Sequence, residues 1–168
     1  MIIILEGPDG GGKTFLAREL EKQLGFRYHH EHNEPTLDSP GLLKRYLSLP
    51  QDNTVYDRMA VSELVYSMAM DRECRLTAEE VKLVMMALKQ CAPVVTVLCQ
   101  PPLEVCIQAL EERGDYLVNV PILTRVWWEY YRLGKDLRQW DFYYDRTLDG
   151  AVEDFIEAIE RFRKVHQK

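Results

Sequence analysis

The 168-residue sequence lacks a long apolar run, a CxxC pair, an internal repeat and any low-complexity segment. A membrane-spanning helix needs about 20 consecutive apolar residues, so we expect no such helix. The cysteines lack the spacing of a disulfide framework or a metal site, which favours a reduced protein in the cytoplasm. No basic region precedes the apolar residues at the N-terminus, so we predict a strand there and not a signal peptide.

Positive charge is outweighed by negative charge, with 21 Lys and Arg residues against 27 Asp and Glu residues. The formal net charge is −6, so the chain as a whole repels nucleic acid unless a basic groove forms locally. Hydrophobic residues make up 46% and charged residues 29% of the chain, which is an ordinary globular composition. A chain of this length is expected to form one domain over residues 1–168.

Strand and helix patterns alternate along the chain. Strands are predicted at 2–5, 26–30, 54–56, 94–99 and 142–145. Helices are predicted at 14–24, 42–49, 61–71, 77–91, 103–113, 122–137 and 151–165. Because the first strand is apolar throughout, it is typical of a sheet buried on both faces. We therefore predict an α/β fold of three layers, α/β/α, with a sheet of five parallel strands.

Residues 7–14 (GPDGGGKT) match the phosphate-binding pattern G-x-x-x-x-G-K-[ST] at every fixed position. An apolar strand runs into this segment and an amphipathic helix runs out of it, as in P-loop proteins; an incidental glycine-rich turn does not require either. Phosphate oxygens must approach main-chain N–H groups closely, which requires minimal side chains at Gly10, Gly11 and Gly12. The following helix directs its positive dipole end at the phosphates.

The residues that close this motif supply charge and a metal ligand. Lys13 places a positive charge on the β- and γ-phosphates, and the Thr14 hydroxyl is a ligand for Mg²⁺. With Gly7 opening the loop, the segment predicts a site for ATP and Mg²⁺. Three features favour a small kinase over other P-loop proteins: the chain is too short for a motor, it has no N/T-K-x-D guanine-reading motif, and its third strand ends in Asp57-Arg58 and not in a DxxG switch.

Four segments resemble those of thymidylate kinases. Residues 5–14 (LEGPDGGGKT) are similar to the F-E-G-x-D-G-x-G-K-T loop of that family, and residues 57–66 (DRMAVSELVY) to its D-R-Y-x-x-S-x-x-A-Y segment. Residues 33–35 (NEP) resemble its R-E-P turn without the arginine, and residues 112–114 (ERG) also fit. The chain is shorter than typical members and most resembles the compact thymidylate-kinase-like proteins of bacteriophages.

The resemblance implies a P-loop kinase fold and transfer of the γ-phosphate of ATP to a deoxynucleoside monophosphate, with Mg²⁺. It places Asp9 near the acceptor sugar and the metal, Arg58 on the acceptor phosphate, and Asp57 beside the metal or its waters. The acceptor pocket implied by the resemblance includes three further residues, Glu34, Ser62 and Tyr66.

The remaining implied roles concern a base, a cation and the adenine. Glu6 occupies the position of a carboxylate near the substrate hydroxyl in related deoxynucleoside kinases, so it is a candidate base. The lid, about 114–125, lacks the dense arginine cluster of the family, which leaves Arg113, ahead of Arg125, as the candidate transition-state cation. Arg146 follows the last strand, where this fold binds adenine, and is a candidate for stacking on it.

Two conspicuous motifs receive other interpretations. His30 and His32 share one face of a strand, but no carboxylate or cysteine companion falls at ligand spacing, which favours a strand end near the acceptor pocket over a metal site. Trp127, Tyr130 and Tyr131 share a helical face, which favours core packing over base stacking with single-stranded nucleic acid.

Several alternatives to the monophosphate kinase stay open. One is a kinase that phosphorylates 5-hydroxymethyluracil bases in DNA, with DNA as the acceptor, and another is a deoxynucleoside kinase with Glu6 as its base. A nucleotide-binding regulator without transfer activity is disfavoured by the joint presence of Lys13, Thr14, Asp57 and Arg58. Family members commonly form homodimers through helices near Ser62, and the resemblance implies the same here.

Overall fold

The computed structural model describes residues 1–31, 37–49, 52–114, 118–135 and 140–166. Five parallel strands form one sheet in the order β2-β3-β1-β4-β5. The strands are β1 (Ile2–Glu6), β2 (Arg27–His30), β3 (Thr54–Asp57), β4 (Val94–Cys99) and β5 (Phe142–Tyr144). The five predicted strands and their parallel arrangement are confirmed.

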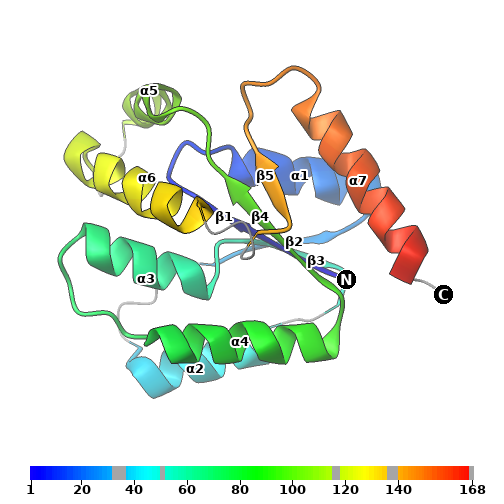
Figure 1. The fold of residues 1–168 in the computed structure, drawn as a ribbon, viewed down its shortest axis with the longest axis horizontal. Coiled ribbons are helices and arrows are strands. Elements are labelled where there is room, and N and C mark those ends of the chain that lie inside the picture. The colour runs from blue at the N-terminus through cyan, green and yellow to red at the C-terminus, as the bar shows by residue number, and fades with distance from the viewer. Residues whose placement is uncertain (32–36, 50–51, 115–117, 136–139, 167–168) are drawn as a thin grey trace.

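Helices cover both faces of the sheet, which makes the predicted three-layer α/β/α fold (Figure 1). On one face lie α1 (Lys13–Leu24) and α7 (Ala151–His166). On the other lie α2 (Ser39–Ser48), α3 (Ala60–Ala69), α4 (Ala78–Cys91) and α6 (Val120–Gly134). The remaining helix, α5 (Leu103–Arg113), packs against α6. Among the described helices none is both long and apolar enough to cross a membrane.

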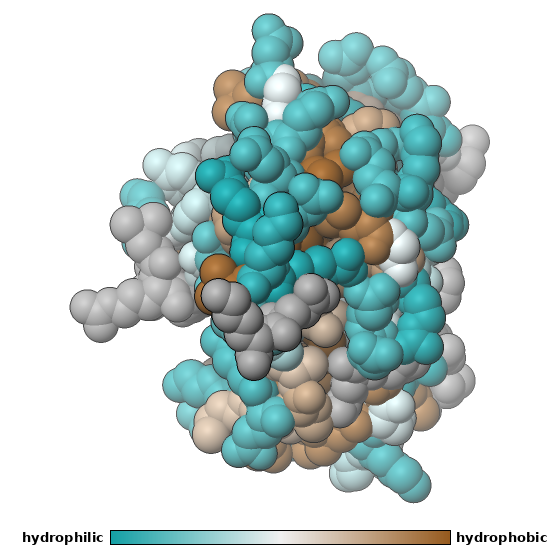
Figure 2. Space-filling model, turned by 90° about the vertical axis from the view of Figure 1, so that its right-hand side faces the viewer, coloured by the Kyte–Doolittle hydropathy of each residue, from teal (hydrophilic) through white to brown (hydrophobic). Residues whose placement is uncertain are grey.

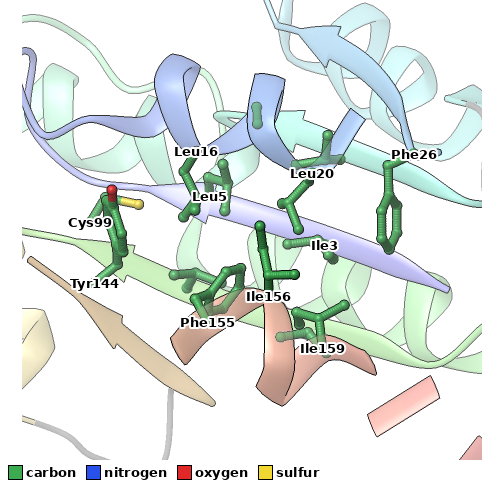
Figure 3. Close-up of a cluster of buried hydrophobic side chains, with 14 residues drawn as sticks. Ile3, Leu5, Leu16, Leu20, Phe26, Cys99, Tyr144, Phe155, Ile156 and Ile159 are labelled. Carbon is green, nitrogen blue, oxygen red and sulfur yellow. The ribbon is translucent and has the colours of Figure 1, made fainter. Parts of the chain in front are cut away.

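Alternation along β1 explains its continuous apolar run. Ile3 and Leu5 point into a cluster with α1 and α7, where Figure 3 shows them beside the side chains of those helices. Ile2 and Ile4 point to the opposite face and pack with α2, α3 and α4. Successive side chains of a strand alternate between faces, so Glu6 belongs to the face of α3 and α6. A carboxylate therefore ends a strand that is otherwise apolar.

The helices begin and end where local chemistry permits. Thr77 and Glu80 form a capping box at the start of α4, and Gly25 ends α1 in a left-handed conformation with φ 67°. The helix α7 buries its apolar stripe against the sheet. Figure 2 shows the face at the right of Figure 1, where hydrophilic residues surround a strip of apolar ones.

The strand order places the carboxyl end of β1 between those of β3 and β4. Leu5 pairs with Asp57 on β3, and Glu6 pairs with Leu98 on β4. In open parallel sheets ligands bind outside the carboxyl ends of the strands, where the strand order changes direction. The fold therefore brings the loop after β1 and the Asp57-Arg58 segment to one place.

Candidate active site

The loop between β1 and α1 leads into a helix N-terminus that has no side-chain cap. Gly12 is the N-cap of α1 with φ 88°, it provides no side-chain hydrogen bond, and the first turn contains no acidic residue. The first N–H groups of a helix have no partner within the helix, and they attract anions. Together with neighbouring side chains, Gly10 to Thr14 line a cleft of about 390 Å³. The residues that the sequence predicts as a phosphate loop therefore lie together beside a cavity.

The glycines of the loop are also needed for packing. A Cβ atom on Gly7 would lie 2.1 Å from the carbonyl oxygen of Cys99, a distance at which real Cβ atoms are not found. One on Gly12 would lie 3.0 Å from the Cδ atom of Arg146, on a backbone with φ 88°. The sequence predicted small residues because phosphate must approach. The structure adds a second reason, because the loop lies directly against the ends of β4 and β5.

Lys13 is buried at the base of the loop. Its Nζ donates hydrogen bonds to the carbonyl oxygens of Gly7 at 3.0 Å and Pro8 at 2.6 Å. Burial, followed by repulsion from Arg58, lowers the pKa of Lys13 to about 8, although Asp57 and Asp9 oppose the shift. Two carbonyl oxygens of the loop thus hold the ammonium group that the motif assigns to phosphate.

Asp57 and Thr14 meet at the other side of the cleft. The Thr14 hydroxyl donates to Oδ2 of Asp57 at 2.5 Å, and Tyr28 donates to the same oxygen at 3.3 Å. His30 Nδ1 lies 3.3 Å from this oxygen. The other carboxylate oxygen, Oδ1, is buried and has no hydrogen-bond partner among the described residues. Burial raises the pKa of Asp57, but Lys13 and the Thr14 hydrogen bond outweigh it and lower the pKa.

This pair fits a hard cation. Mg²⁺ binds oxygen ligands and is commonly held by one or two protein groups together with phosphate oxygens. The Thr14 hydroxyl and the unpartnered Oδ1 of Asp57 are such oxygens. Over the described part of the chain, no group of three or more His, Cys, Asp and Glu side chains is arranged to hold a metal ion. The donor set therefore suits an ion whose remaining ligands come from a bound nucleotide and water.

Asp9, Arg58 and Tyr66 form a second polar group beside the loop. Arg58 donates to Asp9 Oδ1 at 2.6 Å, and the Tyr66 hydroxyl donates to Asp9 Oδ2 at 2.7 Å. The guanidinium lies over the Tyr66 ring, 4.6 Å from its centroid, and donates to the Gly7 carbonyl at 3.2 Å. Burial raises the pKa of Asp9, but Arg58 and Lys13 outweigh it and lower the pKa to about 2.

Two more arginines line the cleft. Arg113, in the last turn of α5, donates to the Ala109 carbonyl at 3.2 Å, and its charge acts on Asp9. Arg146 places its aliphatic part against Gly12. The cleft thus has the cations Lys13, Arg58, Arg113 and Arg146 and the carboxylates Asp9 and Asp57. An acidic chain has concentrated positive charge where a polyphosphate would lie.

Glu6 is enclosed by hydrogen-bond donors. Its side chain has 0% exposure, and Oε2 accepts from the hydroxyls of Ser62 at 2.5 Å and Tyr130 at 2.9 Å. Oε1 accepts from the main-chain N–H of Met59 at 2.9 Å. Burial is the largest influence and raises the pKa of Glu6, against these hydrogen bonds and the charge of Arg58.

Not every predicted site residue joins the cleft. The Ser62 hydroxyl faces Glu6 and Tyr130, so it lies inside the protein and does not line the cleft. Arg125 is exposed on α6 and is not among the described residues that line the cleft. His32, Glu34 and residues 115–117 of the predicted lid lie outside the described residues.

Three contributors were missed or only partly predicted. His30 lines the cleft, as its place at a strand end suggested, and Tyr28 reaches Asp57 from the same strand, a contact that period-2 spacing could have indicated. Tyr130 is fully buried, as predicted for a core residue, but its hydroxyl is bonded to Glu6. Tyr131 is 39% exposed and stacks on Trp127, so the prediction of core packing is wrong for it. No signal in the sequence links Tyr130 to Glu6.

No protein-family model and no curated protein sequence matches this chain. Among solved structures, it is similar to the YorR protein from Bacillus subtilis in complex with phosphorylated GDP, with 22% identity, coverage of 98% of both chains and a TM-score of 0.77. It is also similar to deoxyadenosine kinase from M. mycoides with bound dCTP, with 14% identity, coverage of 96% of this chain and 100% of that chain, and a TM-score of 0.68. These similarities support the P-loop kinase fold.

Proposed function

We propose that this protein is an ATP- and Mg²⁺-dependent kinase that phosphorylates a deoxynucleoside monophosphate. One observation carries the proposal: Lys13 of the phosphate loop and Arg58 after β3 both donate to the same atom, the carbonyl oxygen of Gly7, at 3.0 and 3.2 Å. A cation suited to the donor triphosphate and a cation suited to the acceptor phosphate therefore meet at one point. Such convergence is what transfer between two phosphates requires, since catalysis rests on positioning and charge neutralisation.

The reaction would use these groups as follows. The N–H groups at the start of α1 bind the phosphates of ATP, and Lys13 exchanges the Gly7 and Pro8 carbonyls for β- and γ-phosphate oxygens. Arg58 holds the acceptor phosphate in line. An oxygen of the acceptor phosphate attacks the γ-phosphorus, the bond from that phosphorus to the β–γ bridging oxygen breaks, and ADP leaves. Arg113 adds positive charge on the transferred group.

Thr14 and Asp57 are the residues that would hold Mg²⁺ in this reaction. When bound there, the ion supplies neutralisation of the charge that develops on the phosphate oxygens. His30 and Tyr28 keep the Asp57 carboxylate in place by contacts of 3.3 Å each.

The chemistry of the carboxylates favours a phosphate acceptor over a hydroxyl acceptor. A phosphate oxygen is already ionised at neutral pH, whereas a hydroxyl gains from a nearby base. Glu6 is enclosed at 0% exposure, and Asp9 is paired with Arg58 and has a pKa of about 2. Neither is suited to accept a proton from a substrate.

A deoxynucleoside kinase is the second candidate. It is favoured by the structural similarity to deoxyadenosine kinase from M. mycoides, with a TM-score of 0.68. Its base would have to come from elsewhere in the chain than Glu6 or Asp9.

The deciding experiment is an acceptor panel. The protein, Mg²⁺ and γ-labelled ATP are incubated with the four deoxynucleoside monophosphates, the four deoxynucleosides and DNA that contains 5-hydroxymethyluracil. We expect label in a diphosphate. Label only in a monophosphate would establish the nucleoside kinase, label only in DNA the base kinase, and label in no acceptor a nucleotide-binding protein without transfer activity.

A matched pair of arginine variants tests the acceptor role of Arg58. Arg58→Ala should lower kcat/KM for the acceptor by at least 100-fold while the Kd for ATP changes less than fivefold. Arg161→Ala removes an exposed arginine of α7 and should change neither quantity. Equal loss of ATP binding and transfer in Arg58→Ala would contradict the role.

A further inference from the structure

We propose that Glu6 is a positioning residue whose carboxylate fixes the start of α3, and through it Arg58, and that it takes no proton from the substrate. The inference rests on the proposed function in one respect, because Arg58 is taken to hold the acceptor phosphate. It replaces the role of base that the resemblance to deoxynucleoside kinases implies for Glu6.

The surroundings of Glu6 leave no room for a substrate proton. Both carboxylate oxygens accept hydrogen bonds from protein donors, Oε1 from Met59 N–H at 2.9 Å and Oε2 from the Ser62 and Tyr130 hydroxyls at 2.5 and 2.9 Å. The Ser62 N–H adds a longer contact to Oε1 at 3.4 Å. Glu6 has 0% exposure and is not among the described residues lining the cleft. A general base must reach the proton that it abstracts, directly or through one water.

The carboxylate acts as the missing cap of α3. Met59 is the N-cap of this helix and forms no side-chain cap hydrogen bond. Glu6 accepts from the N–H of Met59, as the glutamate of a capping box does for an N-cap residue. It also accepts, at 3.4 Å, from the N–H of Ser62, the third residue of the helix, which donates to the Met59 carbonyl at 3.1 Å as well. A negative charge at a helix N-terminus is also favourable for the helix dipole. The cap of α3 therefore comes from β1, 53 residues earlier in the chain.

Arg58 lies between two of these attachments. Its own N–H donates to the Leu5 carbonyl at 2.9 Å, and the next N–H, of Met59, donates to Glu6. Arg58 has φ 76°, in the left-handed region that residues other than glycine rarely occupy. Such a conformation persists only where the surroundings hold it. Leu5 and Glu6, the last two residues of β1, therefore accept hydrogen bonds from the N–H groups before and after the Arg58 Cα atom. The loop that begins at Gly7 follows them directly.

Tyr130 ties a third element to the same point. Its hydroxyl lies 2.9 Å from both Glu6 Oε2 and the Ser62 hydroxyl, and it comes from α6 on the same face of the sheet. Three elements, β1, α3 and α6, are thus joined in one buried polar network. Buried networks in which each group has a partner make a local structure rigid and unique. Here the network makes the start of α3 rigid, and Arg58, which directly precedes that start, lines the cleft.

The first test uses Glu6→Gln. An amide oxygen can accept from Met59 N–H while the amide NH₂ donates to the Ser62 or Tyr130 hydroxyl, so the network can be rebuilt. We expect kcat within tenfold of the wild type and an unchanged pH profile of kcat/KM. A base would be lost in this variant, with a fall in kcat of about 100-fold or more and loss of the acidic limb of the profile. That result would overturn the proposal.

The second test loosens the network without changing Glu6. In the double variant Ser62→Ala/Tyr130→Phe, kcat/KM for the acceptor should fall at least tenfold while the Kd for ATP stays within threefold. The matched control is Ser67→Ala/Tyr56→Phe, which removes the same two groups from buried residues of α3 and β3 that do not contact Glu6. An equal fall in both double variants would overturn the positioning role.

A third measurement is independent of any acceptor. The amide hydrogen of Met59 should exchange with solvent at least tenfold faster in Ser62→Ala/Tyr130→Phe than in the control pair, since the group that accepts its hydrogen bond is less firmly held. If no acceptor in the panel is labelled but this exchange is faster, Glu6 still fixes the start of α3 and the kinase assignment is wrong. An unchanged rate of amide hydrogen exchange at Met59 would overturn the positioning role of Glu6, whatever the acceptor proves to be.

Discussion

Raising the pH from 7 to 9 should weaken the binding of ATP by about tenfold, because Lys13 loses its proton in the free protein over this range. Burial, followed by the charge of Arg58, lowers the pKa of Lys13 to about 8. With that pKa the side chain is about nine tenths protonated at pH 7 and about one tenth protonated at pH 9. A triphosphate beside the ammonium favours the charged form, so the bound state keeps the proton. A tenfold change in affinity corresponds to about 1.4 kcal/mol.

Isothermal titration calorimetry measures this linkage directly. Titrations at pH 8 in two buffers of different ionisation enthalpy should show uptake of about half a proton per ATP bound, and of nearly one proton at pH 9. Lys13→Arg is the control, because a guanidinium stays charged throughout this range. Its affinity is expected to be lower overall but constant between pH 7 and 9.

The lowered pKa of Lys13 also affects stability, which changes with pH in the opposite direction to the affinity for ATP. Because the folded state releases the Lys13 proton at about pH 8 and the unfolded state near 10.5, the unfolded chain binds more protons between these values. The contribution of Lys13 to the free energy of unfolding therefore rises with pH in this window. For the binding of ATP, two results would refute the assignment of Lys13 to the triphosphate. One is that the wild type takes up no proton when it binds ATP at pH 8, and the other is that the affinity of Lys13→Arg for ATP falls with pH as that of the wild type does.

Three further predictions concern other parts of the molecule. Gly7→Ala should lower the free energy of unfolding by about 3 kcal/mol or more, since its Cβ would meet the Cys99 carbonyl at 2.1 Å, whereas Gly25→Ala, with φ 67° and no atom within 4 Å, should cost about 1 kcal/mol; chemical denaturation measures both, and equal losses would contradict the packing argument. Arg113→Ala should lower kcat at least tenfold with the Kd for ATP within threefold, while Arg125→Ala, which does not line the cleft, should leave kcat within twofold; similar kinetics for the two variants would remove Arg113 from the mechanism. Glu63, 6% exposed, accepts hydrogen bonds from Arg72 and Arg75; burial raises its pKa, but these bonds outweigh it and lower the pKa to about 2, so its stabilising effect is present above pH 4.5 and is lost as the pH falls towards 2. Glu63→Gln should lower the free energy of unfolding at pH 7 by about 2 kcal/mol and flatten its acid dependence, and an acid transition identical to that of the wild type would show that the pair does not contribute.

Local signals were sufficient for the secondary structure. The strand 94–99 and the helix 103–113 have the predicted limits, because an apolar run, a pair of prolines and a glycine mark them. One predicted limit was wrong: the helix predicted to begin at residue 42 begins at Ser39, with Pro40 and Gly41 in its first turn. Asp38 caps that helix by accepting from Gly41 N–H, and proline is well tolerated at such a position because its missing N–H would have no helical partner.

The sequence by itself was enough to predict the loop of residues 7–14 between its strand and its helix, and to expect Asp57 and Arg58 beside Lys13 and Thr14. Each of these expectations depends on spacing within a short segment or on strand ends that must share one edge of a parallel sheet. Only the tertiary structure decided what Glu6 does. The sequence around a carboxylate at the end of β1 is the same whether the side chain faces a substrate or the N–H groups of a helix. Its environment is made by Met59 and Ser62 at the start of α3 and by Tyr130 of α6. Packing alone brings these donors within 3 Å of the Glu6 carboxylate and shields it from water.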